Sequence, residues 1–481
     1  MKKNDFATWQ MLIKKELLVF YRKKTMLIST TMIWLLFIAA AICTCLDYQS
    51  THAQRVKANT LFRQQWEHQQ RNPHDAAHFG TYLFKSINLL NVFDTGLDDY
   101  AGTTYRVEAH VQHEPDATSA EGNDGSMRFG RLTIALILQL LVPLLLLFIT
   151  ATNITTEKEN GTLKMLLAQG LSTSKLIWAK AISSYLFIGA VVLPIFLLMI
   201  LMLFTSPGSI LLLPRLLWVM SAFLLYFFLI ALLGTLISTW SGNSSKALLT
   251  ALSCWILMSI VIPKLLTGIA DRSYSPMSRA AFTDLVEQGY RKGLNGNDPY
   301  AARGERFVKK LLKSYHADSA SQLPFNIDGL TLQYHEDYRT LVFNHYLAQV
   351  EQQFEQQQQF LTIAGIFNPF ISIKRISMAL SGTDYYHHQN FFKQAQHYRN
   401  HLIKKLNVQL AMYSKGVKGE YKVGPQYFTQ TKSFTDDLPP IEEVVRLNQI
   451  AFAAILGWIM LLALVLRFIA SFYLARNYES V

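Results

Sequence analysis

The chain has 481 residues, of which 51% are hydrophobic and 16% charged, whereas an average soluble domain has about 25% charged residues. Its mean hydropathy of +0.17 excludes a largely disordered chain and also a chain that lies wholly in lipid. The net charge of +12 would suit an anionic partner such as nucleic acid, unless the charge follows membrane topology. Three cysteines, Cys43, Cys45 and Cys254, exclude a disulfide-rich scaffold.

Residues 1–24 form a candidate amphipathic helix. Apolar side chains recur every three or four residues and share one stripe: Phe6, Trp9, Ile13, Leu17 and Phe20. Basic side chains lie on the other side, where they would face anionic lipid headgroups: Lys14, Lys15 and Arg22. We therefore expect a helix that lies in the membrane interface and contacts lipid. The alternative is the ordinary basic flank of a first membrane span.

Six segments are long and apolar enough to cross a bilayer, which takes about 20 residues without charge. The predicted spans are residues 25–46, 131–153, 181–204, 215–240, 247–269 and 450–475. Lys264 and Arg467 lie near the ends of the last two spans, from where a long side chain reaches the interface. The predicted fold class is an all-α polytopic membrane protein with six transmembrane helices.

The first span also has features of a secretory signal peptide, because Ala39, Ala40 and Ala41 offer small residues near its end. Its apolar stretch is longer than the roughly 7–15 residues of such peptides, and a charged stretch of 24 residues precedes it. We therefore expect an uncleaved anchor.

Basic residues set the expected orientation, since cytoplasmic loops carry an excess of Lys and Arg. Residues 1–24 hold seven basic residues and the 154–180 connection holds four, whereas the next connection holds none. Both termini, with the tail at 476–481, are then cytoplasmic, and the segments 47–130 and 270–449 lie outside. These two segments carry charges of −4 and +4, so the +12 belongs to the membrane and cytoplasmic parts and requires no nucleic acid.

Both outer segments have the composition of folded domains. In the first, residues 51–71 show helical spacing, and residues 110–126 have the polar, Gly-containing composition of an exposed loop. The second is expected to form a mainly helical extracytoplasmic domain, with helices at 301–315, 333–366 and 391–413. Breaks are expected at Pro324, Pro369 and Gly382.

The 154–180 connection carries a more specific pattern. It contains the run Glu157-Lys158-Glu159-Asn160-Gly161-Thr162-Leu163-Lys164 and ends with Lys180 at the start of the third span. This Glu-x-Glu-x-Gly-Thr-Leu run resembles the cytoplasmic coupling segment of ABC-2-type transporter permeases. The amphipathic N-terminal helix and the six-span topology resemble the same family. Lys164 stands where that family most often has Glu.

Motifs in the outer segments narrow the resemblance. The first segment contributes Asn72, Pro73, His74, His78 and Gly80, followed by Phe93-Asp94-x-Gly96 and Glu108-Ala109-His110. The second contributes Gly382, Thr383, Asp384, His387 and His388. Together they resemble a bacterial subfamily of these permeases that has large extracytoplasmic insertions of unknown function and is related to the permease of copper-enzyme maturation systems.

The resemblance implies that this chain is the membrane half of an ATP-driven machine. The sequence has no Gly-x-x-x-x-Gly-Lys-Ser/Thr phosphate loop, so ATP would bind a separate ABC ATPase subunit, and this chain would carry no cofactor and no enzymatic activity. The residues expected to couple to that subunit are Glu157, Glu159, Gly161, Thr162 and Leu163. A second permease chain, identical or related, would complete the assembly in the inner (plasma) membrane.

Histidines of the outer segments form two candidate ligand sets, because histidines four residues apart share a helix face. One set is His68, His74 and His78, and the other is Asp384 with His387, His388, His397 and His401. Histidines in outer helices are more often solvated or bonded to backbone, and no cysteine accompanies these, so no metal is assigned. Asp384 and His388 are the one pair suggestive of a hydrolase, and no nucleophile motif accompanies them.

Three functions remain open at this point. The first is a permease that exports or extracts a substrate. The second is a non-transporting subunit that transmits ATPase motion to an extracytoplasmic partner. The third is a membrane-anchored metal-binding maturation factor. The lack of ionisable residues deep in the first four spans argues against a proton or ion relay.

Overall fold

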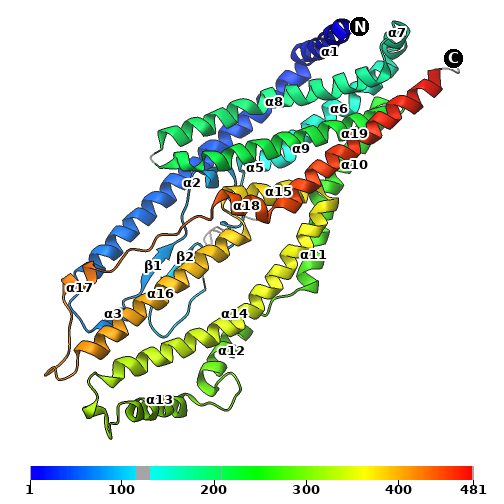
Figure 1. Ribbon diagram of the computed structural model, residues 1–481. Coiled ribbons are helices and arrows are strands. Elements are labelled where there is room, and N and C mark those ends of the chain that lie inside the picture. Colours follow the sequence, from blue (N-terminus) through cyan, green and yellow to red (C-terminus); the bar gives the residue numbers. More distant parts are fainter. Residues whose placement is uncertain (1, 115–130, 207, 479–481) are drawn as a thin grey trace.

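The computed structural model describes residues 2–114, 131–206 and 208–478. The molecule is elongated, with a bundle of long apolar helices at one end and a narrower domain extending from it (Figure 1). Both termini lie at the end of the bundle away from the narrower domain, beside α1 (Lys2–Arg22) and α7 (Thr162–Ala168). We call this end the terminal face. The narrower part is called the distal domain.

Within the described residues, six helices have the length and apolar composition to cross a membrane, which confirms the all-α, six-span prediction. They are α2 (Lys24–Glu67), α5 to α6 (Ile134–Glu159), α8 (Thr173–Thr205), η3 to α9 (Ser209–Trp240), α10 to α11 (Ser244–Ser273) and α19 (Gln449–Tyr478). The predicted helix at 51–71 is the outer half of α2, which continues the first span without a break for 44 residues.

Two of these spans contain a turn of π-helix, namely η2 (Ile137–Leu141) and η4 (Leu257–Val261). A π turn interrupts the regular i to i+4 bonding of the helix. Trp255 Nε1 donates a hydrogen bond to Leu140 O at 3.1 Å, and Asn368 Nδ2 donates to Met258 O at 2.9 Å. Each π turn is therefore bonded to a side chain of another element.

Helix α1 lies along α8. Phe20 is 2% exposed and packs on Phe187, with ring centroids 5.4 Å apart. Ile13 and Leu17 are half-buried on the same side, whereas Phe6 is exposed. From its second turn onward, the apolar stripe predicted from the sequence therefore packs against the bundle.

The second outer segment is mainly helical, as predicted. Its helices are α12 (Arg279–Lys292), α13 (Tyr300–Ser314), α14 (Ile327–Phe367), α15 (Pro369–Ser381), α16 (Tyr385–Tyr413), α17 (Pro425–Thr429) and α18 (Ile441–Leu447). Pro324 precedes α14, Pro369 begins α15, and Gly382 ends α15 with φ +79°. Each predicted break therefore falls at a helix boundary.

The first outer segment contributes short elements. They are α3 (Pro73–Ala77), β1 (Thr81–Phe84), α4 (Leu90–Phe93) and β2 (Thr104–Val107). The two strands pair antiparallel, with Thr81 opposite Val107. Trp66 of α2 packs edge-on against Phe428 in a second apolar core, separate from that of the bundle. The predicted exposed loop at 110–126 lies mostly outside the described residues.

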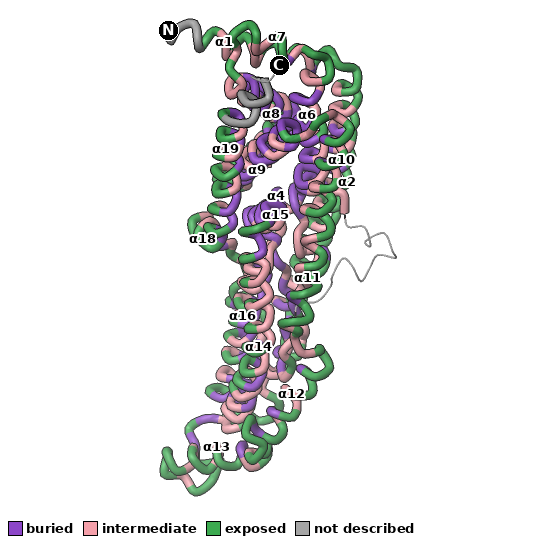
Figure 2. The backbone as a smooth tube through the Cα atoms, turned by 90° about the vertical axis from the view of Figure 1, so that its right-hand side faces the viewer, coloured by how far each residue is buried: buried purple, intermediate pink, exposed green. Residues whose placement is uncertain are grey.

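Two elements of the outer segments, α4 and α15, belong to the core of the bundle. Leu90 and Phe93 of α4 are buried there, as are Ile373, Ile376 and Leu380 of α15. In Figure 2 both helices lie where the bundle meets the distal domain. We call this region, formed by α4, α15 and the loops that follow them, the junction.

Candidate functional site

A buried ion network lies at the terminal face. Lys180 Nζ is 2.8 Å from Glu157 Oε1 and 3.0 Å from Glu16 Oε1. Lys15 Nζ lies 3.5 Å from Glu157 Oε1 and 3.4 Å from Glu16 Oε1. The side chains of Lys180 and Glu16 are only 3% and 5% exposed, so removing one partner would leave an uncompensated buried charge. The network joins α1, α6 (Val142–Glu159) and α8.

The connection between α6 and α7 is held by further contacts of its carboxylates. Thr162 Oγ1 donates to Glu157 Oε2. Glu159 accepts hydrogen bonds from the Ser244 backbone N at 2.7 Å and from Ser244 Oγ at 2.6 Å, at the start of α10. Gly161 begins α7 with φ +71°, a conformation that glycine adopts at little cost. Four of the five predicted coupling residues therefore fix this connection from within the chain.

Helix α7 has one buried and one exposed side. Leu163, the fifth predicted coupling residue, is 1% exposed and packs into the bundle core. Lys164 is exposed, and Met165 exposes 63% of its surface at the terminal face. The exposed side of α7 thus offers a flexible apolar side chain next to a positive charge, which suits contact with another protein.

At the junction, the sequence motifs of the two outer segments meet. Asp94 Oδ2 accepts hydrogen bonds from Ser377 Oγ of α15 and from Gln139 Nε2 of η2, the latter at 3.4 Å. Leu97 N donates to Thr383 O at 2.8 Å. Burial raises the pKa of Asp94, although the hydrogen bonds from Ser377 and from the Gly96 backbone act in the opposite direction. Asp94 therefore links the second span to both outer segments.

A second carboxylate, Asp98, joins the same two segments. Its Oδ1 lies 2.8 Å from Lys85 Nζ and 2.8 Å from His388 Nε2. Lys85 Nζ also donates to Gly382 O at 2.9 Å, and its side chain is 2% exposed. Burial raises the pKa of Asp98, but Lys85 and His388 outweigh that effect and lower it overall. Asp98 is therefore held as a carboxylate that bridges Lys85, which follows β1, and His388 of α16.

His387 connects the distal domain to the fourth span. Its Nδ1 is 2.5 Å from Asp384 Oδ1, and its Nε2 is 3.2 Å from Arg215 Nη1. Because arginine only donates, His387 Nε2 accepts this bond and Nδ1 carries the proton toward Asp384. Arg215 is buried and also donates to Pro439 O. The chain Asp384–His387–Arg215 therefore joins the start of α16 to α9.

A cavity of about 660 Å³ opens between the bundle and the distal domain at the junction. Its lining combines both charge signs with apolar and aromatic surface and includes Asp94, Gln139, Glu355, Lys374, Arg375 and Tyr385. This volume is within the range of pockets that hold small molecules.

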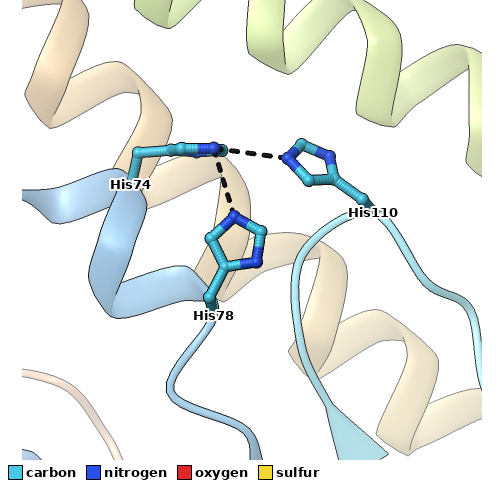
Figure 3. A group of neighbouring side chains, drawn as sticks. All are labelled: His74, His78 and His110. Atoms are coloured by element: carbon cyan, nitrogen blue, oxygen red, sulfur yellow. Dashed lines mark hydrogen bonds between the residues drawn. The ribbon is translucent and has the colours of Figure 1, made fainter.

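The remaining motif residues lie further out, in the distal domain. Asn72 caps α3 by accepting a hydrogen bond from His74 N at 2.8 Å, and Pro73 is the first residue of that helix. Gly80 follows α3 with φ +73° and lies beside the Arg106 side chain. These residues place His74 and His78 next to each other, and His110 approaches from the turn after β2 (Figure 3).

The other candidate ligand residues do not gather. His387 and His388 contact different carboxylates, Asp384 and Asp98. His68 bonds to the backbone O of Gln64 in its own helix, and His397 and His401 are exposed on α16. Among the described residues, the only group of three ligand-type side chains close enough to hold a metal is His74, His78 and His110.

Sequence reasoning missed the partners that these sites require. Glu16 is an acid on the apolar stripe of α1, between Ile13 and Phe20, and a charge on a buried stripe indicates a partner. His110 was noted in a motif but not as a ligand, because 36 residues separate it from His74. No local signal could have found Glu336 or Asn407, which contact these histidines from far along the chain.

The described part of the chain thus combines a bundle of six membrane-length helices, an ion network beside an exposed short helix, and a folded domain at the other end. Residues 74–271 match the model of the ABC-2 family transporter protein, and residues 279–436 match a domain of unknown function (DUF3526). The chain therefore contains a region that matches the ABC-2 transporter membrane domain and a second region that matches an additional domain, which confirms the resemblance to ABC-2-type permeases. No curated protein matches the chain.

Proposed function

We propose that this chain is the permease subunit of an ATP-driven transporter, with ATP hydrolysed by a separate ABC ATPase subunit and a substrate exported or extracted through the bundle. The observation that carries the proposal is the terminal face, where a buried ion network holds α7 with Met165 outward. In this proposal the terminal face is cytoplasmic, as its excess of Lys and Arg favours.

The coupling residues then divide into two roles. Glu157, Glu159, Gly161 and Thr162 fix the position of α7, and Leu163 anchors it to the bundle core. The exposed side of α7, with Met165, contacts the ATPase. When the ATPase closes on nucleotide, a displacement of α7 passes through Lys180 to α8 and α1.

The junction cavity is the proposed substrate site. It lies at the outer end of the spans and mixes charged, polar and apolar lining, which suits an amphipathic or bulky substrate better than an inorganic ion. Gln139 of the second span and Arg375 of α15 both line it, so relative movement of the second span and α15 would change its shape.

A second permease chain is proposed to cover the apolar surface that one chain leaves open. The most apolar stretches of α2 and of α10 to α11 are the least buried of the six spans, at 17% and 11% of their residues. Lipid or a second copy must cover this surface in a plasma membrane.

The test is co-purification of the full chain from its own membranes. We expect an ABC ATPase to accompany the unaltered protein, with ATP hydrolysis in the purified complex. Met165→Asp places a charge on the exposed side of α7 and is expected to reduce both the retained ATPase and the activity by about 10-fold, which corresponds to about 1.4 kcal/mol.

The matched control is Val417→Asp, which introduces the same charge at an exposed apolar residue of the distal domain and should leave the complex intact. If Met165→Asp retained the ATPase as well as Val417→Asp does, the proposed contact would be wrong. If no ATPase accompanied the unaltered chain, the permease proposal itself would be overturned.

A second candidate is a subunit that transmits ATPase motion to the distal domain without transport. The observation that favours it is the continuity of α2 from the terminal face into the distal domain, together with the buried Arg215–His387 contact. In the reconstituted complex, fluorophores on α13 and on the 205–209 connection should then change their separation when ATP is added. An unchanged separation during ATP turnover would exclude this second candidate.

A further inference from the structure

Three imidazole rings converge in the distal domain, outside the surfaces used by the proposed function. His74 Nε2 lies 3.3 Å from His78 Nε2 and 3.3 Å from His110 Nε2, and all three ligand nitrogens lie within 4.8 Å of one another (Figure 3). His74 and His78 come from α3 and the residue that follows it, and His110 comes from the turn after β2.

These separations match the spacing of a metal site. Three imidazole nitrogens bound to one tetrahedral Zn²⁺ at 2.0–2.1 Å lie roughly 3.3–3.4 Å apart. The two spacings around His74 already have this value, and the third, between His78 and His110, is within 4.8 Å.

The outer nitrogens of two rings are held by hydrogen-bond acceptors. His74 Nδ1 lies 3.1 Å from Asn407 Oδ1, and His110 Nδ1 lies 2.7 Å from Glu336 Oε1. Because carbonyl and carboxylate oxygens only accept, both Nδ1 atoms carry protons, and the Nε2 atoms are directed to the centre of the group. A ligand histidine bonded through its second nitrogen to a carboxylate or carbonyl is the usual support of a metal site.

Glu336, which contacts His110 Nδ1, is a buried and paired carboxylate. Glu336 is 3% exposed, and its Oε2 accepts a hydrogen bond from Arg399 Nη2 at 2.8 Å. Burial raises the pKa of Glu336, but the hydrogen bond from His110 and the charge of Arg399 outweigh it and lower the pKa to about 2. The carboxylate therefore remains ionised at any physiological pH and orients the His110 ring.

The backbone of His110 is also constrained. Its φ is +64°, one of two positive values among the described residues other than glycine, and such a conformation costs of order 1–3 kcal/mol. His110 N donates to the same Glu336 Oε1 at 2.6 Å, so one carboxylate fixes both the ring and the backbone. This strain places the His110 ring beside the other two.

We propose that His74, His78 and His110 bind one divalent transition-metal cation, with Zn²⁺ as the reference ion, leaving a fourth coordination position open to water or to a ligand. Neutral imidazoles suit Zn²⁺ and the neighbouring first-row metals, and a site with three protein ligands keeps an exchangeable position. The bound cation would link the first outer segment to α14 and α16 through Glu336 and Asn407.

The test uses the full-length chain in detergent, stripped with a chelator and titrated with Zn²⁺ at neutral pH. We expect one equivalent of Zn²⁺ per chain. His78→Ala should weaken the affinity by about 100-fold or more, because it removes a ligand while its exposed side chain contributes little to folding.

The control is His401→Ala, an exposed histidine of the same domain that should bind Zn²⁺ as the unaltered chain does. Thermal unfolding checks the fold independently. Without metal, His78→Ala and the unaltered chain should unfold at the same temperature. Zn²⁺ should raise the unfolding temperature of the unaltered chain only. Stoichiometric binding that survives in His78→Ala, or no binding by the unaltered chain, would overturn the proposal.

Discussion

At Gly96 the two outer segments lie in close contact. Its φ of +47° lies in the left-handed region, and a Cβ built on it would be 2.3 Å from Thr383 Oγ1 and 2.7 Å from Thr383 O. The next residue, Leu97, donates its backbone N–H to the same carbonyl oxygen. Both backbone conformation and space therefore require glycine here.

We predict that Gly96→Ala destabilises the protein by about 2 kcal/mol or more, because the backbone is strained and Thr383 must move. Thermal unfolding of the purified chain measures the effect. Gly424→Ala is the control, since its φ is −96° and no atom lies within 4 Å of an added Cβ. Equal unfolding temperatures for the two variants would contradict the close contact at the junction.

Local patterns predicted individual residues only where their role is local. Pro369 and Gly382 bound α15 as expected, because backbone geometry decides both positions. The contacts of Asp94 with Ser377 and of His110 with Glu336 join residues more than 200 positions apart. Their geometry depends on how α4, α14 and α15 pack, and no periodicity in the sequence encodes that packing.

At the scale of elements, close helix packing in the bundle depends on one glycine. A Cβ at Gly234 of α9 would lie 1.8 Å from Thr150 Oγ1 and 2.8 Å from Thr150 Cβ of α6. Small residues at membrane helix interfaces allow such close approach, and van der Waals contact then supplies the attraction. This contact holds the second and fourth spans together close to the start of the 154–180 connection.

Gly234→Ala is expected to separate α6 from α9 and to lower stability by about 1–3 kcal/mol, through overpacking of a buried contact. The readout is the unfolding temperature in detergent, followed by size-exclusion chromatography. Gly189→Ala in α8 serves for comparison, because nothing lies within 4 Å of its added Cβ. Equal unfolding temperatures for Gly234→Ala and Gly189→Ala would contradict the close packing of α6 against α9.

Hydrophobic patterning predicted where the helices lie in the sequence. It did not predict which helix of an outer segment packs into the core of the bundle. All six spans fall where long uncharged apolar runs placed them, and α13, α14 and α16 fall where apolar periodicity placed them. The sequence did not indicate that α15 packs into the bundle core, because its buried face of Ile373, Ile376 and Leu380 has the same pattern as a helix of a soluble domain.

The whole molecule has two apolar cores joined by a polar junction. One core fills the bundle and the other fills the distal domain, and Asp94, Asp98 and His387 bond across the region between them. The terminal face and the tip of the distal domain at α13 lie at opposite ends (Figure 1). If the bundle spans a membrane, these two ends are on opposite sides.

Cysteine labelling tests this orientation. In a chain with Cys43, Cys45 and Cys254 changed to alanine, Lys418→Cys in the distal domain should react with a membrane-impermeant maleimide in intact cells. Gln169→Cys after α7 should react only after the membrane is opened. Both positions are exposed, so access alone decides the result. The reverse pattern would place the terminal face outside and would remove the basis for an ATPase contact there.

The unbroken length of α2 sets how small movements scale across the molecule. At 1.5 Å per residue its 44 residues extend about 66 Å, roughly twice the thickness of a hydrocarbon core. A tilt of about 5° around one end therefore displaces the other end by about 6 Å. An angular change too small to disturb the packing of the bundle is thus amplified into a displacement larger than a water molecule at the far end of the same helix.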